Sequence, residues 1–180
     1  MCIFKSFALK VKVWKDNHLT LVLSVVEEIF DMAVDGMTII TVRDRGVTVQ
    51  ELLSLTESNK FAIKASIEGR APIALTKNHL HAVASDARGI LIFDRSNYKV
   101  TGVLQGHELI VNCLKMSEDG KRLYSAGWDE KVNVWDVETN KLVTSGKVDF
   151  AVHQMCLGSR VGEVVVGGSQ GAIALLQFKA

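Results

Sequence analysis

A histidine, a serine and an aspartate lie in one stretch of the chain and could form a hydrolytic triad. They are His107, Ser125 and Asp129. In such a triad the serine attacks a carbonyl carbon, the histidine takes its proton and the carboxylate orients the histidine. One large class of serine hydrolases places the serine in a G-x-S-x-G turn, beside N–H groups that stabilise the oxyanion. Ser125 lies in no such motif, and we therefore expect no catalytic residue in this set.

Two other sets of side chains have metal-binding or redox chemistry, but their spacing does not favour it. His79 and His81 are two residues apart, so on a strand they would face the same way and could share a metal ion. No third ligand can be assigned from spacing. The cysteines lack the spacing of metal ligands or of a disulfide framework; they are Cys2, Cys113 and Cys156. We expect no metal, no cofactor and a reducing compartment, the cytoplasm and/or the nucleus.

The composition limits the classes of partner. The 180 residues include 21 Lys and Arg against 20 Asp and Glu, with no basic block. This balance gives no electrostatic case for binding nucleic acid or an anionic membrane. No run approaches the roughly 18 uncharged apolar residues of a transmembrane helix, and lysines interrupt the apolar start of the chain. The hydrophobic fraction of 48% predicts sheets that are packed on both faces.

The triad-like residues belong to a longer pattern over residues 106–136. The stretch begins with Gly-His, ends with Trp-Asp, and has two alternating apolar segments joined by the turn Ser117–Gly120. It resembles a WD40 repeat, one unit of a β-propeller. The residues that carry this resemblance are Gly106, His107, Ser125, Asp129, Trp135 and Asp136. It implies that four of them form a structural hydrogen-bonded chain across one blade: His107, Ser125, Asp129 and Trp135.

If one repeat is present, its neighbours should follow at a period of about 40–45 residues. Taking Trp135 as the reference, Phe93 lies 42 residues earlier and Leu176 lies 41 residues later. Gln50 lies 43 residues before Phe93, and Trp14 lies 36 residues before Gln50. Each of these positions ends an alternating apolar run, as a strand with two different faces should. We therefore predict that the five positions are equivalent in five successive sheets.

The same period makes a prediction about two cysteines. Cys113 and Cys156 are 43 residues apart, which suggests equivalent positions on the first strands of successive blades. We expect both to be small core residues, because unpaired cysteine is among the most buried residue types.

The chain is expected to be an all-β, WD40-type partial propeller of about four repeats. Labelling the strands of a blade a to d from the inside out, residues 1–25 should supply strands c and d. Three blades should follow, and the chain should end on strands a, b and c. The expected segments after residue 25 are about 26–68, 69–105, 106–147 and 148–180.

Two arrangements of the first strands are compatible with this pattern. In one, His18–Val25 pairs with the last blade and closes a small four-bladed ring, which leaves Leu9–Trp14 without a partner. In the other, these two segments form a hairpin across Asp16-Asn17, and roughly five sheets form an open arc. We favour the arc, as a C-terminal piece of a propeller with further blades upstream, because the short hairpin has the smaller loop-closure cost.

The resemblance implies a non-catalytic scaffold that binds other proteins on the loop face of the propeller. Trp128 and Asn112 are the candidate partner-binding residues, since the family exposes these positions there and tryptophan is enriched in binding hot spots. Further blades or another copy of the chain could cover the open ends of the arc. Two alternatives remain at this point: a propeller enzyme with an active site in the central channel, and a substrate-recognition subunit of a ubiquitin ligase.

Overall fold

The computed structural model describes most of the chain as antiparallel sheets. It describes residues 2–6, 10–15, 18–24, 29–35, 38–43, 46–51, 57–61, 72–76, 79–83, 89–97 and 99–179, with side chains at 31–33, 40–41, 72–76, 89–97 and 99–179. In these ranges the regular structure consists of strands and one 3-10 turn, Ser169–Gly171. The prediction of an all-β fold is confirmed.

Within the described ranges, eighteen strands form five sheets, and in each sheet every strand pairs antiparallel with the next strand along the chain. The first sheet contains β1 (Cys2–Ser6), β2 (Lys10–Lys15) and β3 (His18–Ser24). The second contains β4 (Ile29–Asp35), β5 (Thr38–Arg43), β6 (Gly46–Glu51) and β7 (Glu57–Phe61). The third contains β8 (Ile73–Leu75), β9 (His79–Val83), β10 (Ile90–Asp94) and β11 (Val100–Leu104). The fourth contains β12 (Val111–Met116), β13 (Arg122–Gly127), β14 (Lys131–Asp136) and β15 (Lys141–Lys147). The fifth contains β16 (Val152–Leu157), β17 (Glu163–Gly168) and β18 (Ile173–Gln177).

The five reference positions of the repeat lie on equivalent strands. Trp14, Gln50, Phe93, Trp135 and Leu176 lie on β2, β6, β10, β14 and β18. In the first four of these strands, the register with the following strand shifts immediately before the reference residue. A β-bulge recurs at a fixed place only when the local geometry of the repeat is conserved within the fold. The predicted period is therefore confirmed.

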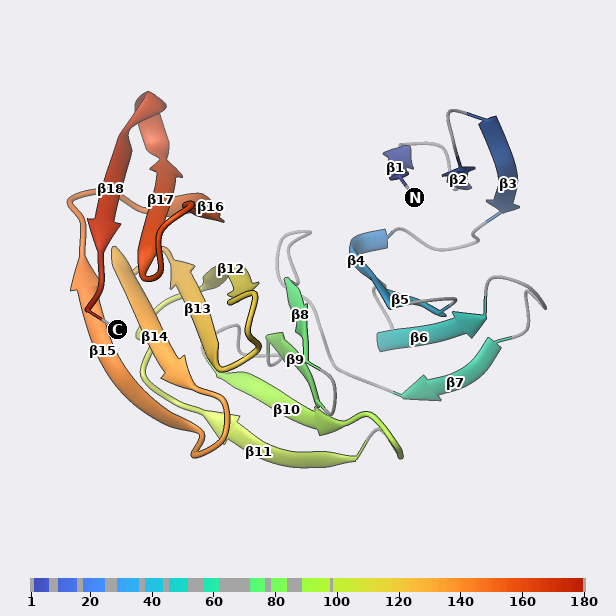
Figure 1. Cartoon of the computed structure of the whole chain (residues 1–180), viewed down its shortest axis with the longest axis horizontal. Helices are drawn as coiled ribbons and strands as arrows, with labels where there is room; N and C mark the ends of the chain where they lie inside the picture. The colour runs from blue at the N-terminus through green and yellow to red at the C-terminus, as the bar shows by residue number, and fades with distance from the viewer. Residues whose placement is uncertain are drawn as a thin grey trace.

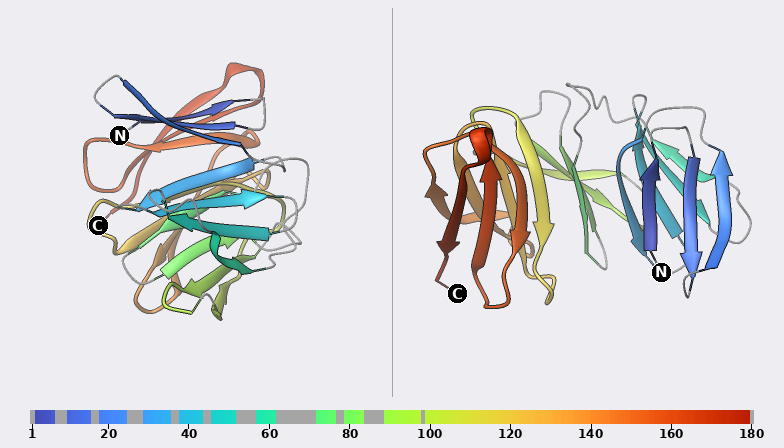
Figure 2. Two further views of the ribbon diagram at one scale, coloured as in Figure 1. Left: turned by 90° about the vertical axis from the view of Figure 1, so that its right-hand side faces the viewer. Right: turned by 90° about the horizontal axis from the view of Figure 1, so that it is seen from above.

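The sheets stand side by side around an open arc (Figure 1). The first strand of each of the second, third and fourth sheets contacts the first strand of the next sheet, and these strands form the inner side of the arc. The first and last sheets lie apart, as the right-hand view of Figure 2 shows. β3 pairs with β2 and not with β18. The open arc is thus confirmed, and the four-bladed ring is wrong.

The first sheet has one strand more than expected, because Cys2–Ser6 forms β1 and pairs with β2. Only two strands, c and d, were expected in residues 1–25. A lysine in an apolar run does not exclude a strand, because a strand alternates its side chains between two faces.

Apolar side chains on both faces of the fourth sheet hold it against its two neighbours. One face packs on the third sheet through a cluster of Ala74, Ile90, Ile92, Leu104, Val111, Leu114, Leu123 and Trp135. The other packs on the fifth sheet through Cys113, Tyr124, Ala126, Val132, Val134, Val152, Met155, Val164, Val166 and Phe178. The high hydrophobic fraction of the chain has its explanation in this two-sided burial.

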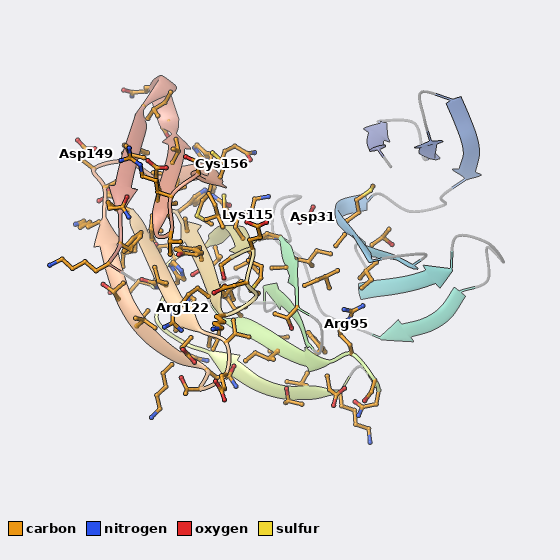
Figure 3. All side chains as sticks on the ribbon, in the orientation of Figure 1. Asp31, Arg95, Lys115, Arg122, Asp149 and Cys156 are labelled. Carbon is orange, nitrogen blue, oxygen red and sulfur yellow. The ribbon has the colours of Figure 1, made fainter. Side chains whose placement is uncertain are left out.

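The expectation for the two cysteines is wrong for one of them. Cys113 is buried, but Cys156 is an exposed free thiol on β16, near the end of the arc (Figure 3). Val111 and Val152 each pair with the last glycine of the following strand, and the register shifts directly after each. The true offset between β12 and β16 is therefore 41 residues, so Cys156 is equivalent to the exposed Lys115. A period averaged over a repeat does not locate single positions within strands whose connecting loops differ in length.

A substitution at Gly127 tests how closely the chain before β12 approaches the end of β13. A Cβ atom at Gly127 would overlap the carbonyl oxygen of Ile110, which accepts the N–H of Trp128 at 2.8 Å. We predict that Gly127→Ala lowers the free energy of unfolding by about 1–3 kcal/mol, because the backbone must shift to accept the methyl group. The control is Gly102→Ala, where the nearest atom, Ile92 Cδ1, is at an ordinary 3.5 Å. Urea unfolding measures both; equal effects of the two substitutions would contradict the assignment of overlap to Gly127.

Candidate functional site

The structure brings together the four residues of the predicted polar chain in the fourth sheet. The ring of His107 lies between Asp129 and Ser125, with Nδ1 2.9 Å from Asp129 Oδ2 and Nε2 2.7 Å from Ser125 Oγ. The indole Nε1 of Trp135 donates to the same hydroxyl oxygen at 2.8 Å. The four groups come from the β11–β12 loop, β13, the β13–β14 turn and β14, so the hydrogen-bonded network joins two strands to a loop and a turn.

With a neutral His107 ring, the donors and acceptors of this network fit one pattern. The carboxylate of Asp129 accepts a hydrogen bond from the Nδ1–H group of His107, which leaves Nε2 as the acceptor for the Ser125 hydroxyl. Ser125 Oγ then accepts from Trp135, whose indole nitrogen is a donor only. Every member has a partner, as buried polar groups in a low-dielectric interior require.

Burial separates this arrangement from a hydrolytic triad. Ser125 has no exposed surface and His107 retains 7%, while the Trp135 indole occupies one side of the hydroxyl. A substrate carbonyl carbon has no path to Ser125 Oγ, and a general base must reach its substrate proton to act. The geometry therefore makes Ser125 a structural centre and not a nucleophile.

Asp129 also fixes the loop face of the sheet. Its carboxylate accepts the backbone N–H of Glu108 at 3.0 Å and that of Lys131 at 3.3 Å. Burial opposes ionisation of the carboxyl group, but the hydrogen bond and attraction of His107 and the two N–H groups outweigh it and lower the pKa of Asp129. One carboxylate thus ties the β11–β12 loop to the β13–β14 turn.

Asp136, at the other end of β14 from Asp129, also holds a turn in place through its carboxylate. It accepts the backbone N–H of Thr139 at 2.8 Å and its hydroxyl at 2.9 Å, and it pairs with Arg122. These bonds, the N–H of Thr139 first, lower the pKa of Asp136 to about 2. The Trp-Asp pair therefore places one residue in the core and one at the following turn.

Hydrogen bonds also tie the first strands of neighbouring sheets together, which the sequence analysis missed. Asp31 Oδ2 on β4 accepts the N–H of Ile73 on β8 at 3.0 Å, and Asn112 Nδ2 on β12 donates to the carbonyl of Val152 on β16 at 2.8 Å. Figure 3 shows Asp31 at the boundary between the second and third sheets. A polar residue on an inner strand was the available signal, but only the packing of sheets gives it a partner.

The prediction that Asn112 binds a partner on the loop face is wrong, because Asn112 bonds to the neighbouring sheet instead. The residue is only 8% exposed because the fifth sheet covers it, so its side chain is not presented to a partner on the loop face. The hydrogen bond of Asn112 connects the fourth sheet to the fifth.

Trp128 lies in the β13–β14 turn beside Asp129, and its side chain is half-buried. Its backbone N–H donates to the carbonyl of Ile110 at 2.8 Å, while Nε1 is buried without a hydrogen-bond partner among the residues that the structure describes. The adjoining loop carries Leu109, which is 50% exposed. The same loop is tied to the turn by an ion pair between Glu108 and Lys131 at 2.6 Å. Leu109 was not identified from the sequence, since a single leucine in a loop carries no pattern.

The expectation that the chain contains no G-x-S-x-G motif is wrong, because residues 167–171 match it. In this match, Ser169 Oγ lies 3.0 Å from His153 Nε2, and the pair is exposed. The match forms the turn between β17 and β18. In hydrolases the motif is a strained turn from a strand into a helix, so the context does not support a nucleophile here.

The remaining candidates concern metal ions and membranes. The side chains of His79 and His81 lie outside the part of the chain whose side chains are described. Among the described residues, no cluster of three or more His, Cys, Asp or Glu side chains could hold a metal ion. Within the same residues, no helix has the length and apolarity needed to cross a membrane.

The polar chain can be tested through its central hydroxyl. Ser125→Ala leaves His107 Nε2 and Trp135 Nε1 buried without their common partner, so we predict a loss of about 1–3 kcal/mol per unsatisfied group in the free energy of unfolding. The exposed Ser159 is the matched control, and Ser159→Ala should change stability by less than about 0.5 kcal/mol. Denaturant unfolding decides; an unchanged midpoint for Ser125→Ala would show that the four groups do not depend on one another.

The lowered pKa of Asp129 predicts that the free energy of unfolding decreases at acidic pH. Its folded pKa lies below the ordinary value of 3.8, so its contribution is complete above that value and is lost as the pH falls through the folded pKa. The wild-type stability should therefore fall between about pH 5 and pH 2.5 more steeply than that of Asp129→Asn. Urea unfolding across this range measures the two slopes. Parallel curves would rule out a lowered pKa at this carboxyl group.

Comparison with known proteins agrees with the repeat. Residues 98–136 match the family model described as "WD domain, G-beta repeat". The transcription factor unc-37 of Caenorhabditis elegans is 34% identical over 104 residues, which is 57% of this chain and 17% of that protein. The WD repeat-containing protein 89 homolog of Dictyostelium discoideum is 36% identical over 69 residues, which is 38% of this chain and 19% of that protein. The chain thus spans less than a fifth of the length of these curated relatives.

Solved structures share the fold at lower identity. The WD40 β-propeller domain of Doa1 superposes with a TM-score of 0.79 at 21% identity, covering 96% of this chain and 59% of that one. A chain of the mitotic checkpoint complex gives a TM-score of 0.78 at 21% identity, covering 94% of this chain and 55% of that one. Residues 98–136 therefore form a WD40 repeat, and the described sheets have the fold of part of a WD40 β-propeller.

Proposed function

We propose that the chain is a non-catalytic scaffold that binds partner proteins on its loop face, in the cytoplasm and/or the nucleus. The observation that carries the proposal is the rigid loop cluster around Trp128. The Asp129 carboxylate accepts N–H groups from Glu108 and Lys131, so the turn that carries Trp128 is held against the neighbouring loop. A site on a rigid scaffold loses little conformational entropy on binding.

The chemistry of this cluster suits a protein surface. Trp128 presents a large half-buried side chain, and its Nε1 has no hydrogen-bond partner among the described residues, so a partner's acceptor would remove a desolvation cost. Leu109 adds exposed apolar surface, and Glu108 and Lys131 supply charges of both signs at its edge. An apolar centre with a polar rim is the usual composition of a protein–protein interface.

The relatives support a binding role of this kind. WD40 propellers are generally interaction scaffolds, one curated relative is a transcription factor, and one structural neighbour belongs to a multiprotein complex. The polar set that most resembles a catalytic triad is buried and fully paired, which leaves the loop face as the better supported surface.

Trp128→Ala tests the proposal. Partner proteins captured by the wild-type chain should be purified and their affinities measured by calorimetry; the substitution should weaken binding by about 2 kcal/mol or more, as expected for a tryptophan hot spot. The matched control is Val161→Ala, an apolar residue that is 80% exposed in the β16–β17 turn, at the other end of the strands. An unchanged affinity for every partner after Trp128→Ala would exclude this residue as the anchor.

A further inference from the structure

The loops on the face that carries Trp128 contain more carboxylates than lysines. Lys131 at the start of β14 pairs in register with Lys147 at the end of β15, so the β13–β14 turn and the β15–β16 loop lie at the same end of the fourth sheet. The charged residues in the described loops at this end and at the adjoining strand ends are Glu108, Asp129, Glu130, Lys131, Lys147 and Asp149. With a neutral His107 ring, this described part of the loop face is therefore negatively charged.

Glu130 and Asp149 are the carboxylates of this face whose charge is open to a partner. Lys147 Nζ lies 3.6 Å from Glu130 Oε2, and neither side chain is buried. The N–H of Val148 donates to the carbonyl of Glu130 at 2.9 Å, which places Asp149 next to the turn that carries Glu130. Among the described residues the exposed Asp149 forms no ion pair, and Figure 3 shows it at the connection between the fourth and fifth sheets.

The indole N–H of Trp128 is a buried donor that has no acceptor among the described residues. The backbone of this residue is held in place, because its N–H donates to the carbonyl of Ile110 at 2.8 Å and because the chain passes so close to Gly127 that a Cβ atom there would overlap it. A buried donor without an acceptor destabilises the folded state, and natural proteins break such rules mainly at functional sites. Rotation of the half-buried side chain is the movement that can bring Nε1 to an acceptor on a partner.

The carboxylates near Trp128 restrict the kind of acceptor. Asp129 and Glu130 follow Trp128 directly in the turn, and they would repel a partner's carboxylate, because like charges repel strongly in a partly desolvated site. A backbone carbonyl carries no net charge and accepts hydrogen bonds through two lone pairs. A cationic side chain next to that carbonyl would be attracted to Glu130 and Asp149. The charges and the unpaired donor therefore point to the same class of partner.

We propose that the loop face selects a basic segment of a partner protein. A backbone carbonyl of this segment accepts a hydrogen bond from Trp128 Nε1, and an arginine or lysine beside it pairs with Glu130 and Asp149. The inference rests on the proposed function, since it uses the same surface, and it adds the chemical class of the partner. The fourth sheet packs against a described neighbour on each face, so the surface does not depend on an unpaired sheet edge. A nucleic acid or an acidic segment would be repelled here.

A random dodecapeptide library displayed on phage tests the charge preference of the full chain. After selection on the wild-type protein, the recovered peptides should contain more arginine and lysine, and less aspartate and glutamate, than the input library. A selection that enriches no peptide, or that enriches peptides without a basic bias, would overturn the proposal.

Two carboxylate variants then locate the charges that matter. A synthetic copy of a recovered peptide should bind about fivefold more weakly to the double variant Glu130→Gln, Asp149→Asn at low salt, where interactions between exposed charges are least screened. The matched control is Glu138→Gln, an exposed carboxylate in the β14–β15 turn at the opposite end of the sheet, which should bind within about twofold of the wild type. Equal affinities of the double variant and the control would contradict the assignment of the cation to Glu130 and Asp149.

The indole N–H resonances report the hydrogen bond directly by NMR. The resonance of Trp128 is the one that disappears in Trp128→Phe. In the wild-type chain with a saturating recovered peptide, this resonance should shift downfield and its exchange with water should slow by about tenfold, as expected for a donor that gains an acceptor. The Nε1–H of Trp135 already donates to Ser125 at 2.8 Å and should not change. An unmoved Trp128 resonance with the peptide bound would refute the donated hydrogen bond.

The loop-face proposal and this inference fail in different ways. If the recovered peptides bind Trp128→Ala as tightly as the wild type, the loop-face proposal is wrong and the inference is wrong with it. If binding requires Trp128 but is the same in the double variant Glu130→Gln, Asp149→Asn, the loop face remains the binding surface and only the basic class of partner is wrong.

Discussion

The burial of apolar side chains on both faces of a sheet is the constraint on which the rest of this structure depends. On β14, Val132 and Val134 face the fifth sheet and Trp135 faces the third, and all are almost fully buried. A sheet of this kind is stable only between two neighbours, as in other repeat architectures. The arc follows directly, because each sheet must present one apolar face to the sheet before it and another to the sheet after it.

The polar groups of the fourth sheet give this stack its precision. Apolar packing is not directional, whereas the bonds from Asp129 through His107 and Ser125 to Trp135 fix the relative positions of a loop, a turn and two strands. The same residues hold the turn that presents Trp128. The structural network and the proposed binding surface are therefore two sides of one arrangement, and a loss of the first should loosen the second.

The sequence predicted the features that depend on local pattern. The polar residues of one well-preserved repeat, the spacing of the positions represented by Trp14 and Trp135, and the hairpin at the start of the chain all follow from composition, periodicity and loop length. It failed where contacts between sheets decide. Asn112 is buried because the fifth sheet covers it, and Cys156 is exposed because loop lengths shift the offset between β12 and β16 to 41 residues. Asp31 acquires its partner only through packing against β8.

Native-state amide hydrogen exchange tests the central claim most directly, because protection reports the local stability of each sheet. The fourth sheet has described neighbours on both faces and a complete polar network, while one face of the fifth carries Ile173 and Leu175 at 77% and 65% exposure. The account predicts that the paired amides of β13 and β14 exchange far more slowly than those of β17 and β18. Equal protection of the two sheets would contradict the dependence of each sheet on a neighbour on either side.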